Sequence, residues 1–170
     1  DNGMPVVLLR AADFDVSGEE TPEQLENDAA LKSRIEAIRL AIGPRMNLGD
    51  VTRKTVPKMC LVSPPRQGGA ISTRTFIPHR VHESIGVLGA VSVATGCMVP
   101  GSVAAKLARL SRDSAAQRVE VEHPTGFFTV DMEVTTEGDA VNVRRSALLR
   151  TARKLMSGEV FVPGAVWSGR

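Results

Sequence analysis

The stretch "PHRVHESIGVLGAVSVATGC", residues 78–97, decides the fold of this chain. It begins with a polar loop that holds two histidines and an arginine, and it then runs from Ser84 to Cys97 without a charged residue. We predict a helix from about Ser84 to Cys97. Because a helix that is apolar on all sides has to be buried, the stretch predicts a central helix whose Gly and Ala residues let a sheet approach closely.

The N-terminus of this helix is the first candidate binding site. A helix N-terminus leaves backbone N–H groups unpaired and carries a partial positive charge, so it binds an anion where it opens into a cleft. Ser84, Ile85 and Gly86 would hold a carboxylate there, with Ser84 as a cap or a ligand. Arg80 and His82 lie on the loop that leads into this end. The alternative is a plain core helix with a solvated loop.

The loop holds two histidines, His79 and His82, and Glu83 follows the second of them. These three residues raise the question of a metal site. Zinc sites need a spaced set of Cys, His and carboxylate ligands. The sequence offers no such set elsewhere, so we expect no metal ion.

The other candidate residues are each open to two interpretations. Lys58 lies in the apolar strand "VPKMCLV", where desolvation would lower its pKa and suit it to proton transfer; a lysine at a sheet edge would instead extend into water. Cys97 fits a small core residue better than a nucleophile. A tight turn at Asp1, Asn2 and Gly3 would present amides to a ligand or be a simple turn.

Composition narrows the class of protein. The chain has 170 residues, enough for one domain or two small ones. A net charge of +2 and an aromatic content of 4% argue against a nucleic-acid or anionic-membrane surface. Two cysteines favour a reduced, cytoplasmic chain, and no secretory signal is visible. The chain begins without Met and enters a strand almost at once, so we expect it to be the second part of a longer polypeptide.

The alternation of apolar and polar residues, with Pro and Gly as breaks, predicts the remaining elements. Thr21 and Pro22 begin a helix that Gly43 and Pro44 end. The last three strands form an antiparallel meander, and the fold class is α+β with a mostly antiparallel sheet rolled around the central helix. The predicted strands cover 4–11, 55–63, 70–77, 118–122, 126–133 and 141–149. A short helix is predicted at 102–110 and a brief helix or turn at 151–158. An extended segment, 159–167, ends the chain.

Four blocks of the sequence resemble a known family: "DNGMPVVLLRAADF", "MNLGDVTRKTVPKMCLVSPPRQGGAISTRTFIPHRVHESIGVLGAVSVATGCMVPGS", "VEVEHPTG" and "RRSALLRTARKLMSGEVFVP". In this order they are similar to the second half of the 4-oxalomesaconate tautomerases, which belong to the methylaconitate isomerase family. The resemblance covers nearly the whole chain.

The resemblance implies a fold like that of diaminopimelate epimerase, in which two similar halves each roll a sheet around a central helix. The active site lies between the halves, and each helix N-terminus points into it. The implied reaction moves a proton across an allylic system of an unsaturated polycarboxylate without cofactor or metal, during breakdown of gallate or related aromatics. Residues 1–170 would be one domain, the C-terminal half, with the N-terminal half as its partner and a homodimer as a further option.

By the same resemblance, the family's lysine and cysteine for proton transfer belong to the first half, which this chain lacks. The pseudo-symmetry of the two halves places Lys58 at the position of that lysine and His82 near that of the cysteine. Arg80 would clamp a carboxylate, and Asn2, Gly3 and Met4 would line the opposite wall. Two other functions stay open: a methylaconitate isomerase of the same family, and a carboxylate-binding module without activity.

Overall fold

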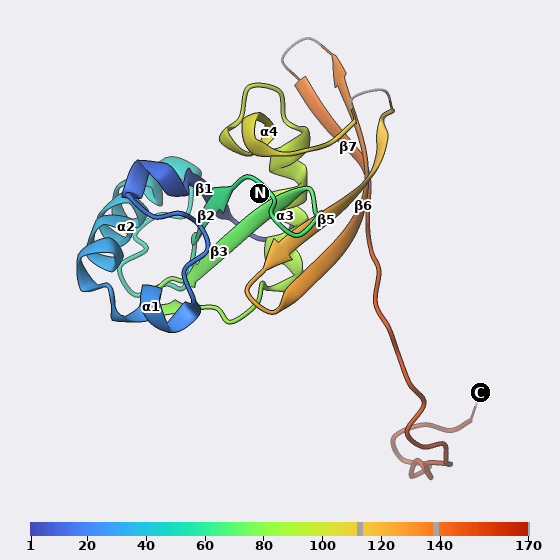
Figure 1. Cartoon of the computed structure of the whole chain (residues 1–170). Coiled ribbons are helices and arrows are strands. Elements are labelled where there is room, and N and C mark those ends of the chain that lie inside the picture. Colours follow the sequence, from blue (N-terminus) through green and yellow to red (C-terminus); the bar gives the residue numbers. More distant parts are fainter. Residues whose placement is uncertain (112–113, 138–139, 170) are drawn as a thin grey trace.

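The central helix predicted from residues 78–97 is α3, Val87–Met98, and the sheet curls around it (Figure 1). The structure is a computed structural model that describes residues 1–111, 114–137 and 140–169. Its architecture is α+β, as the sequence predicts. The elements in chain order are β1 Val6–Arg10, the 3-10 helix η1 Ala11–Phe14, α1 Pro22–Asn27, α2 Ala29–Ile42, the 3-10 helix η2 Pro44–Met46, β2 Lys58–Ser63, β3 Ile71–Ile77, β4 Arg80–Val81, α3, α4 Val103–Leu107, β5 Ala116–His123, β6 Gly126–Glu137 and β7 Ala140–Leu148.

One mixed sheet joins the strands of the described residues in the order β1-β2-β3-β5-β6-β7, with the short β4 paired to β3. Strands β1 and β2 are parallel, and so are β3 and β5, whereas the other pairs are antiparallel. The prediction of a mostly antiparallel sheet and of a β5-β6-β7 meander is therefore confirmed. Strands β3 and β5 meet at two paired positions only, Ile71 with Val121 and Ser72 with Glu122.

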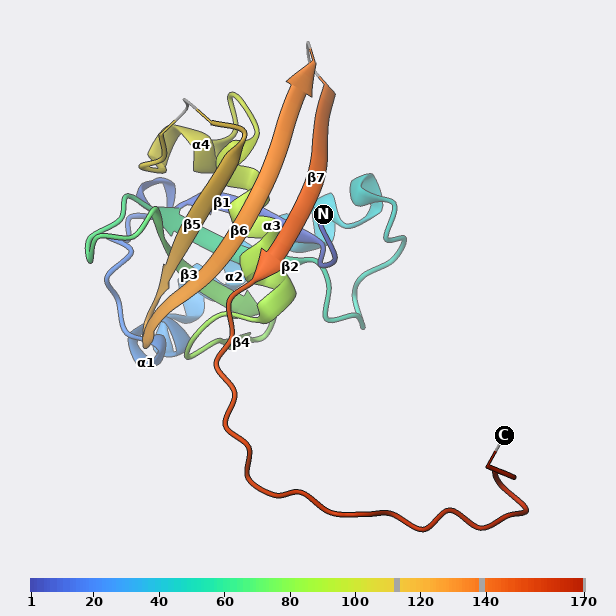
Figure 2. The same ribbon diagram turned by 90° about the vertical axis from the view of Figure 1, so that its right-hand side faces the viewer.

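The sheet separates two hydrophobic cores. On one face, Cys60 and Val62 of β2 pack with α3 and with the inner side of β5 and β6. On the other face, Met59 and Leu61 pack with α1 and α2. Figures 1 and 2 show α1 and α2 outside the curl and α3 inside it. Alternate residues of a strand point to opposite faces, so one strand supplies both cores.

Small residues on α3 let the helix lie close to β1. A Cβ atom at Gly96 would overlap the side chain of Leu8, while Ala90 and Ala94 are fully buried. Glycine costs a helix interior about 1 kcal/mol relative to alanine, so close packing against the sheet explains its presence here. The Gly and Ala content of the sequence indicated this approach correctly.

Replacing Gly96 with valine is expected to lower the free energy of unfolding by about 1–3 kcal/mol, because an overpacked core is strained. Gly158→Val is the matched control, since nothing lies within 4 Å of a Cβ at Gly158. Thermal unfolding of both variants checks the expectation. An unchanged midpoint for Gly96→Val would mean that β1 yields to the larger side chain.

Two predicted helices differ from those observed. The single helix from Pro22 to Ile42 is two helices, because the Asp28 side chain accepts a hydrogen bond from the N–H of Leu31 (2.8 Å) and caps a new start. Residues 151–158 were expected to form a brief helix or turn, but they are extended and exposed. They contact too little of the protein to support a helix of two turns, which is marginal in water. In the part of the chain described, no helix is long and apolar enough to cross a membrane.

Candidate functional site

Helix α3 begins two or three residues later than the sequence predicts. Gly86 is the N-cap, with an extended backbone (φ −67°, ψ 144°) and no side-chain cap. The first intrahelical bond runs from the N–H of Ala90 to the carbonyl of Gly86 (2.8 Å). The N–H groups of Val87, Leu88 and Gly89 precede that bond and have no carbonyl acceptor within the helix. Together with the N–H of the N-cap Gly86, they are the amides that this helix end leaves without an intrahelical acceptor; the anion that the sequence predicts there stays a prediction.

Ser84 and Ile85 have other roles than the sequence predicts. The backbone N–H of Ser84 donates to Nδ1 of His82 (3.0 Å), so Ser84 is drawn to the loop and does not cap the helix. Ile85 is 6% exposed and packs in the core around α3. Gly86 stays open, with nothing within 4 Å of a Cβ placed there. Of these three residues, Gly86 is the one that borders free space at the helix end.

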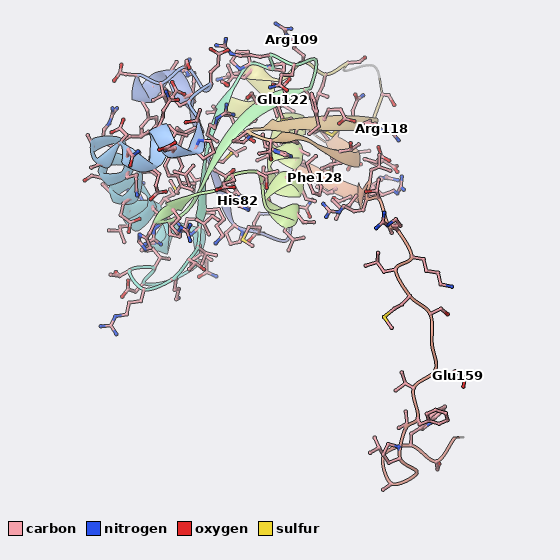
Figure 3. All side chains as sticks on the ribbon, turned by 60° about the horizontal axis from the view of Figure 1, so that its bottom comes forward. His82, Arg109, Arg118, Glu122, Phe128 and Glu159 are labelled. Atoms are coloured by element: carbon pink, nitrogen blue, oxygen red, sulfur yellow. The ribbon has the colours of Figure 1, made fainter. Side chains whose placement is uncertain are left out.

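His82 lies on the α3 face of the sheet. Its backbone N–H donates to the carbonyl of Thr75 (2.8 Å), which continues the pairing of β4 with β3 by one residue. Thr75 pairs with Cys60 of β2, and its Oγ1 donates to Sγ of Cys60 (3.5 Å). Since paired residues share a face and Cys60 belongs to the core around α3, His82 points to the side of α3. Figure 3 shows His82 beside that helix.

Arg80 and Lys58 lie on the same face of the sheet as His82. Arg80 is two residues before His82, and Lys58 is two residues before Cys60. Arg80 pairs with Ile77 and alternates with Val81, which packs in the opposite core. Lys58 alternates with Met59, which also packs there. Side chains two apart on a strand share a face, so both cations are on the side of α3, next to the row that holds His82. The register thus brings three predicted site residues from two separate strands to one surface.

The Lys58 side chain is half-buried, and burial lowers the pKa of its amine. Its Nζ donates to the carbonyl of Thr55 (2.6 Å) in the loop before β2. A lowered pKa raises the fraction of neutral amine near pH 7, the form that accepts a proton. The side chain therefore combines a partly buried stem with an amine at an exposed loop carbonyl, and its part in proton transfer stays a prediction.

The short strand β4, which carries Arg80, is fixed from behind by α1. The N–H of Val81 donates to Oε2 of Glu26 (2.7 Å). The hydrogen bond from Lys32, and after it that from Val81, holds the pKa of Glu26 below its usual range. This carboxylate keeps β4 at the sheet edge while its alternate residues point towards α3.

The N-terminal segment runs along α3. Asn2 donates its side-chain amide to Oγ1 of Thr95 (2.9 Å) and to Oγ of Ser146 on β7 (2.8 Å), so it joins the helix to the last strand. The hydroxyl of Ser92 donates to the carbonyl of Met4 (2.7 Å). These bonds use the Asn2 amide donors and the Met4 carbonyl within the fold.

Gly3, between them, has a left-handed backbone (φ 89°) that favours glycine. A Cβ there would lie 3.3 Å from the side chain of Leu88 in the first turn of α3. Of the three predicted wall residues, Gly3 is therefore the one that lies beside the helix N-terminus.

His79 does not join this surface. It interacts electrostatically with Glu36 of α2, on the outer side of the sheet. Within residues 1–111, 114–137 and 140–169, no group of three or more His, Cys, Asp or Glu side chains is placed to hold a metal ion.

His123 is a neighbour of the site that sequence reasoning missed. It ends β5 and interacts electrostatically with His82, and burial is the main cause of its lowered pKa. In the turn that follows, Oγ1 of Thr125 donates to the carbonyl of Glu83 (3.3 Å). The sequence showed "HPTG" only as a hairpin turn; its contact with residues 82–83 depends on how the sheet curls.

The surface around the helix N-terminus is open and partly apolar. Val87 and Leu88 are 38% and 45% exposed, although both belong to an otherwise buried helix. A cavity of about 430 Å³ lies at the other end of α3, near Cys97 and Met98. Burial raises the pKa of Cys97 to about 12 and that of Cys60 to about 11, so both thiols are inert core groups.

Comparison with known proteins places this arrangement in a family. The model of the PrpF protein family matches residues 1–163. The chain belongs to the PrpF family. The matched region includes every predicted site residue and ends in the exposed segment that follows β7.

Two curated proteins are similar to this chain over nearly its whole length. The (4E)-oxalomesaconate Delta-isomerase of Novosphingobium sp. (strain KA1) is 58% identical over 162 residues, which are 95% of this chain and 44% of that protein. The 4-oxalomesaconate tautomerase of Pseudomonas putida is 57% identical over 169 residues, 99% of this chain and 45% of that protein. The chain thus spans less than half the length of the curated relatives it matches.

More distant matches include a curated protein and a solved structure. The 2-methyl-aconitate isomerase of Shewanella oneidensis is 26% identical over 178 residues, covering 95% of this chain and 44% of that protein. A solved structure, the crystal structure of a methylitaconate-delta-isomerase, matches with a TM-score of 0.73 and 22% identity over 96% of this chain and 46% of that one. This likeness shows that the two chains share a fold.

Proposed function

We propose that this chain is the second half of an isomerase that shifts a proton along an unsaturated polycarboxylate, with 4-oxalomesaconate as its substrate. The observation that carries the proposal is the identity of 57–58%, over 95–99% of this chain, to two enzymes named for that compound. The surface formed by Lys58, Arg80, His82 and the α3 N-terminus supports it, since it gathers groups that hold a carboxylate beside groups that move a proton.

Arg80 and the α3 N-terminus are the carboxylate-binding groups of the proposed site. The exposed guanidinium of Arg80 presents a planar fork that matches a carboxylate. The N–H groups of Val87, Leu88 and Gly89 offer fixed donors without a counter-charge. A substrate with several carboxylates would be held at both places, with its reacting carbons between them.

The proton shift begins when a base removes a proton from the carbon next to the carbonyl or extended acid. The C–H electron pair becomes part of a dienolate, the double bond moves along the carbon chain, and the proton returns at the far end or on oxygen. Lys58 or His82 takes or returns that proton, and no electron is gained or lost overall. The helix N–H groups stabilise the developing oxyanion, each such donor being worth about 3 kcal/mol in the barrier.

The proposal places residues 1–170 as a single domain opposite a first half that completes the cleft. The exposed Val87 and Leu88 support this, because an apolar edge beside a polar site is suited to being covered. In the same proposal the whole enzyme has a diaminopimelate epimerase-like architecture with two central helices. It works in the cytoplasm on breakdown products of gallate-type aromatics, and it forms a homodimer.

Arg80→Ala and His82→Ala test the site in the full-length enzyme. We expect Arg80→Ala to raise KM about 10- to 100-fold through loss of a charged hydrogen bond, and His82→Ala to lower kcat about 100-fold as a lost acid–base group does. The measurement is the steady-state isomerisation rate, with folding checked by circular dichroism.

Arg109→Ala is the matched control for Arg80→Ala. Arg109 is also exposed, but it lies far from His82, at the top of Figure 3. Normal turnover in both the Arg80 and the His82 variants would remove these residues from the site.

A second candidate substrate is methylaconitate, favoured by the 2-methyl-aconitate isomerase of Shewanella oneidensis at 26% identity. The ratio of kcat/KM for 4-oxalomesaconate to that for methylaconitate decides between the two. A protein that binds tricarboxylates but exchanges no substrate proton for deuterium would instead be a carboxylate-binding module.

A further inference from the structure

Arg39 of α2 is the largest completely buried side chain among the described residues, and the proposed mechanism gives it no part. A buried guanidinium needs a counter-charge and acceptors for its N–H groups. The carboxylate of Glu36, on the same helix, accepts from Nε (2.7 Å) and from Nη2 (2.8 Å). This bidentate pair uses one edge of the planar group, and the third nitrogen, Nη1, is left for other acceptors.

The acceptors of Nη1 belong to the anchored loop, defined here as residues 47–57 between η2 and β2. Nη1 donates to the carbonyls of Val51 (2.9 Å), Lys54 (3.2 Å) and Val56 (2.9 Å). Because this nitrogen has two hydrogens, at least one of them is shared between two carbonyls. Residues 47–57, all of them described, contain neither helix nor strand. A side chain from α2 therefore replaces the backbone partners that such an element would supply.

The carbonyl of Thr55, between the bound carbonyls of Lys54 and Val56, has a different partner. It accepts a hydrogen bond from the amine of Lys58 (2.6 Å). The backbone N–H of Lys58 donates to the carbonyl of Pro5 (2.8 Å) and so begins the pairing with β1. The backbone of Lys58 is thus fixed by the sheet, and the end of its side chain by the Thr55 carbonyl.

The anchored loop connects the two faces of the sheet. Helix α2 packs with Met59 and Leu61 on the outer face, whereas Lys58 lies on the face of α3. Figure 1 shows α2 outside the curl and α3 inside it. Residues 54–56 join these two sides just before β2 begins, because the middle carbonyl holds the lysine and the carbonyls on either side hold the buried Arg39.

We propose that Arg39 is a positioning residue for Lys58. By holding the carbonyls of Lys54 and Val56, it fixes the carbonyl of Thr55 at the point where that carbonyl binds the lysine amine. A lysine side chain has many rotamers of similar energy, and a fixed acceptor selects the one seen here. Without Arg39 the loop is released and the amine turns into water. The consequence for catalysis rests on the proposed function, in which Lys58 moves the proton, but the placement of the amine does not.

Arg39→Met in the full-length enzyme is the first test, and Arg34→Met is its matched control. Arg34 belongs to the same helix, but its ion pair with Asp15 (3.6 Å) is exposed. The pKa of Lys58 is followed by NMR of isotope-labelled lysine side chains, with its signal assigned from a Lys58→Met sample. We expect this pKa to rise by about 0.5–1 in Arg39→Met, because burial is what lowers it in the wild-type protein.

The kinetic effect follows from that rise. The neutral fraction of the Lys58 amine at neutral pH falls about 3- to 10-fold, and kcat for 4-oxalomesaconate falls at least as far. KM is expected to stay within about twofold, since the proposed carboxylate-binding groups are untouched. Arg34→Met is expected to change neither the pKa of Lys58 nor kcat.

Thr55→Gly separates the place of the carbonyl from the charge of the arginine. Loss of a nearby positive charge would also raise the pKa of Lys58, whereas Thr55→Gly keeps Arg39 and loosens the backbone that carries the carbonyl. We expect the pKa and kcat to change in the same direction as in Arg39→Met. Thr52→Gly, at an exposed threonine of the same loop, is the matched control. The described ionisable groups on this side of the sheet and in the loop are kept in all these variants: Arg80, His82, Asp50, Arg53 and Lys54.

A folded Arg39→Met enzyme with the wild-type pKa of Lys58 would limit Arg39 to a role in stability and overturn the proposal. So would a pKa that rises in Arg39→Met but not in Thr55→Gly, because charge would then be the cause. If Arg39→Met does not fold, Thr55→Gly decides alone, by whether the pKa of Lys58 rises. This pKa is measured without substrate, so a rise in both variants with no loss of kcat, or in an enzyme inactive on 4-oxalomesaconate, would contradict the proposed function and leave the positioning role supported.

Discussion

Replacing Lys58 with methionine is expected to lower kcat about 100- to 10,000-fold, the range for loss of a general acid or base. Methionine keeps most of the length and the apolar stem but has no proton to exchange. The reason for the expectation is the position of Lys58 on the α3 face, together with burial that lowers its pKa. The measurement is kcat for 4-oxalomesaconate in the full-length enzyme, with deuterium incorporation into substrate as a second readout.

Lys54→Met is the control for this variant. The Lys54 amine donates to the carbonyl of Leu48 (2.7 Å) much as the Lys58 amine donates to that of Thr55 (2.6 Å), but Lys54 is exposed and precedes the strand. A normal kcat in Lys54→Met shows that loss of a lysine–loop hydrogen bond is not itself the cause. If Lys58→Met keeps kcat within about threefold, the proton is moved by another group.

The pH dependence follows from the same lowered pKa. The neutral amine is the base, so kcat/KM in the wild-type enzyme is expected to rise as pH rises through an ionisation below that of an ordinary lysine. Stability changes in the same direction: between the folded and the unfolded pKa of Lys58 the unfolded chain binds more protons, so unfolding becomes less favourable as pH rises. Lys58→Met is expected to remove that limb of the pH profile.

Replacing Arg39 with methionine is expected to lower the free energy of unfolding by about 2–4 kcal/mol, because it removes the buried donor of a partly exposed carboxylate and of several loop carbonyls. Arg39 has no exposed surface. Its guanidinium donates to both Glu36 carboxylate oxygens (2.7 and 2.8 Å). These bonds raise the pKa of Arg39 and lower that of Glu36.

The same guanidinium also donates through Nη1 to the carbonyls of Val51 (2.9 Å), Lys54 (3.2 Å) and Val56 (2.9 Å). Methionine would remove this donor from the loop that precedes Lys58, although the Val51 carbonyl would still accept from the N–H of Lys54 (2.9 Å). Urea unfolding at neutral pH measures the loss, and Arg45→Met, an exposed arginine just after the same helix, is expected to stay within about 0.5 kcal/mol of wild type. A loss below about 1 kcal/mol for Arg39→Met would mean that water replaces the arginine.

The burial of α3 could be predicted because a helix that is apolar on all sides is stable only when the rest of the protein covers it. Its starting residue could not, since this depends on a contact between the Ser84 N–H and His82 Nδ1. That contact leaves Gly86, not Ser84, in the extended cap conformation. The split of α1 from α2 had a visible signal in Asp28, a residue type that caps helices, inside a run that was interpreted as continuous.

The sequence indicated which residues belong to the candidate site, but only in part how they are arranged in space. The basic loop before an apolar helix indicated Arg80 and His82, and an isolated strand lysine indicated Lys58. Their shared face depends on the register of β2, β3 and β4, which local patterns in a single sequence do not reveal. The bonds of Asn2 to Thr95 and Ser146 join residues 93 and 144 positions apart, beyond any local pattern.

The narrow junction between β3 and β5 has a consequence for how the chain folds. The β5-β6-β7 meander is built from contacts close in sequence, so it can form early, whereas β1 and β2 pair residues as distant as Val6 and Lys58. The buried Glu122 carboxylate accepts the N–H groups of Gln67 and Gly69 (2.8 Å each) across the junction. We therefore expect the β5-β6-β7 meander to form before it joins β1, β2 and β3, with the Glu122 carboxylate fixing the register where the two parts meet.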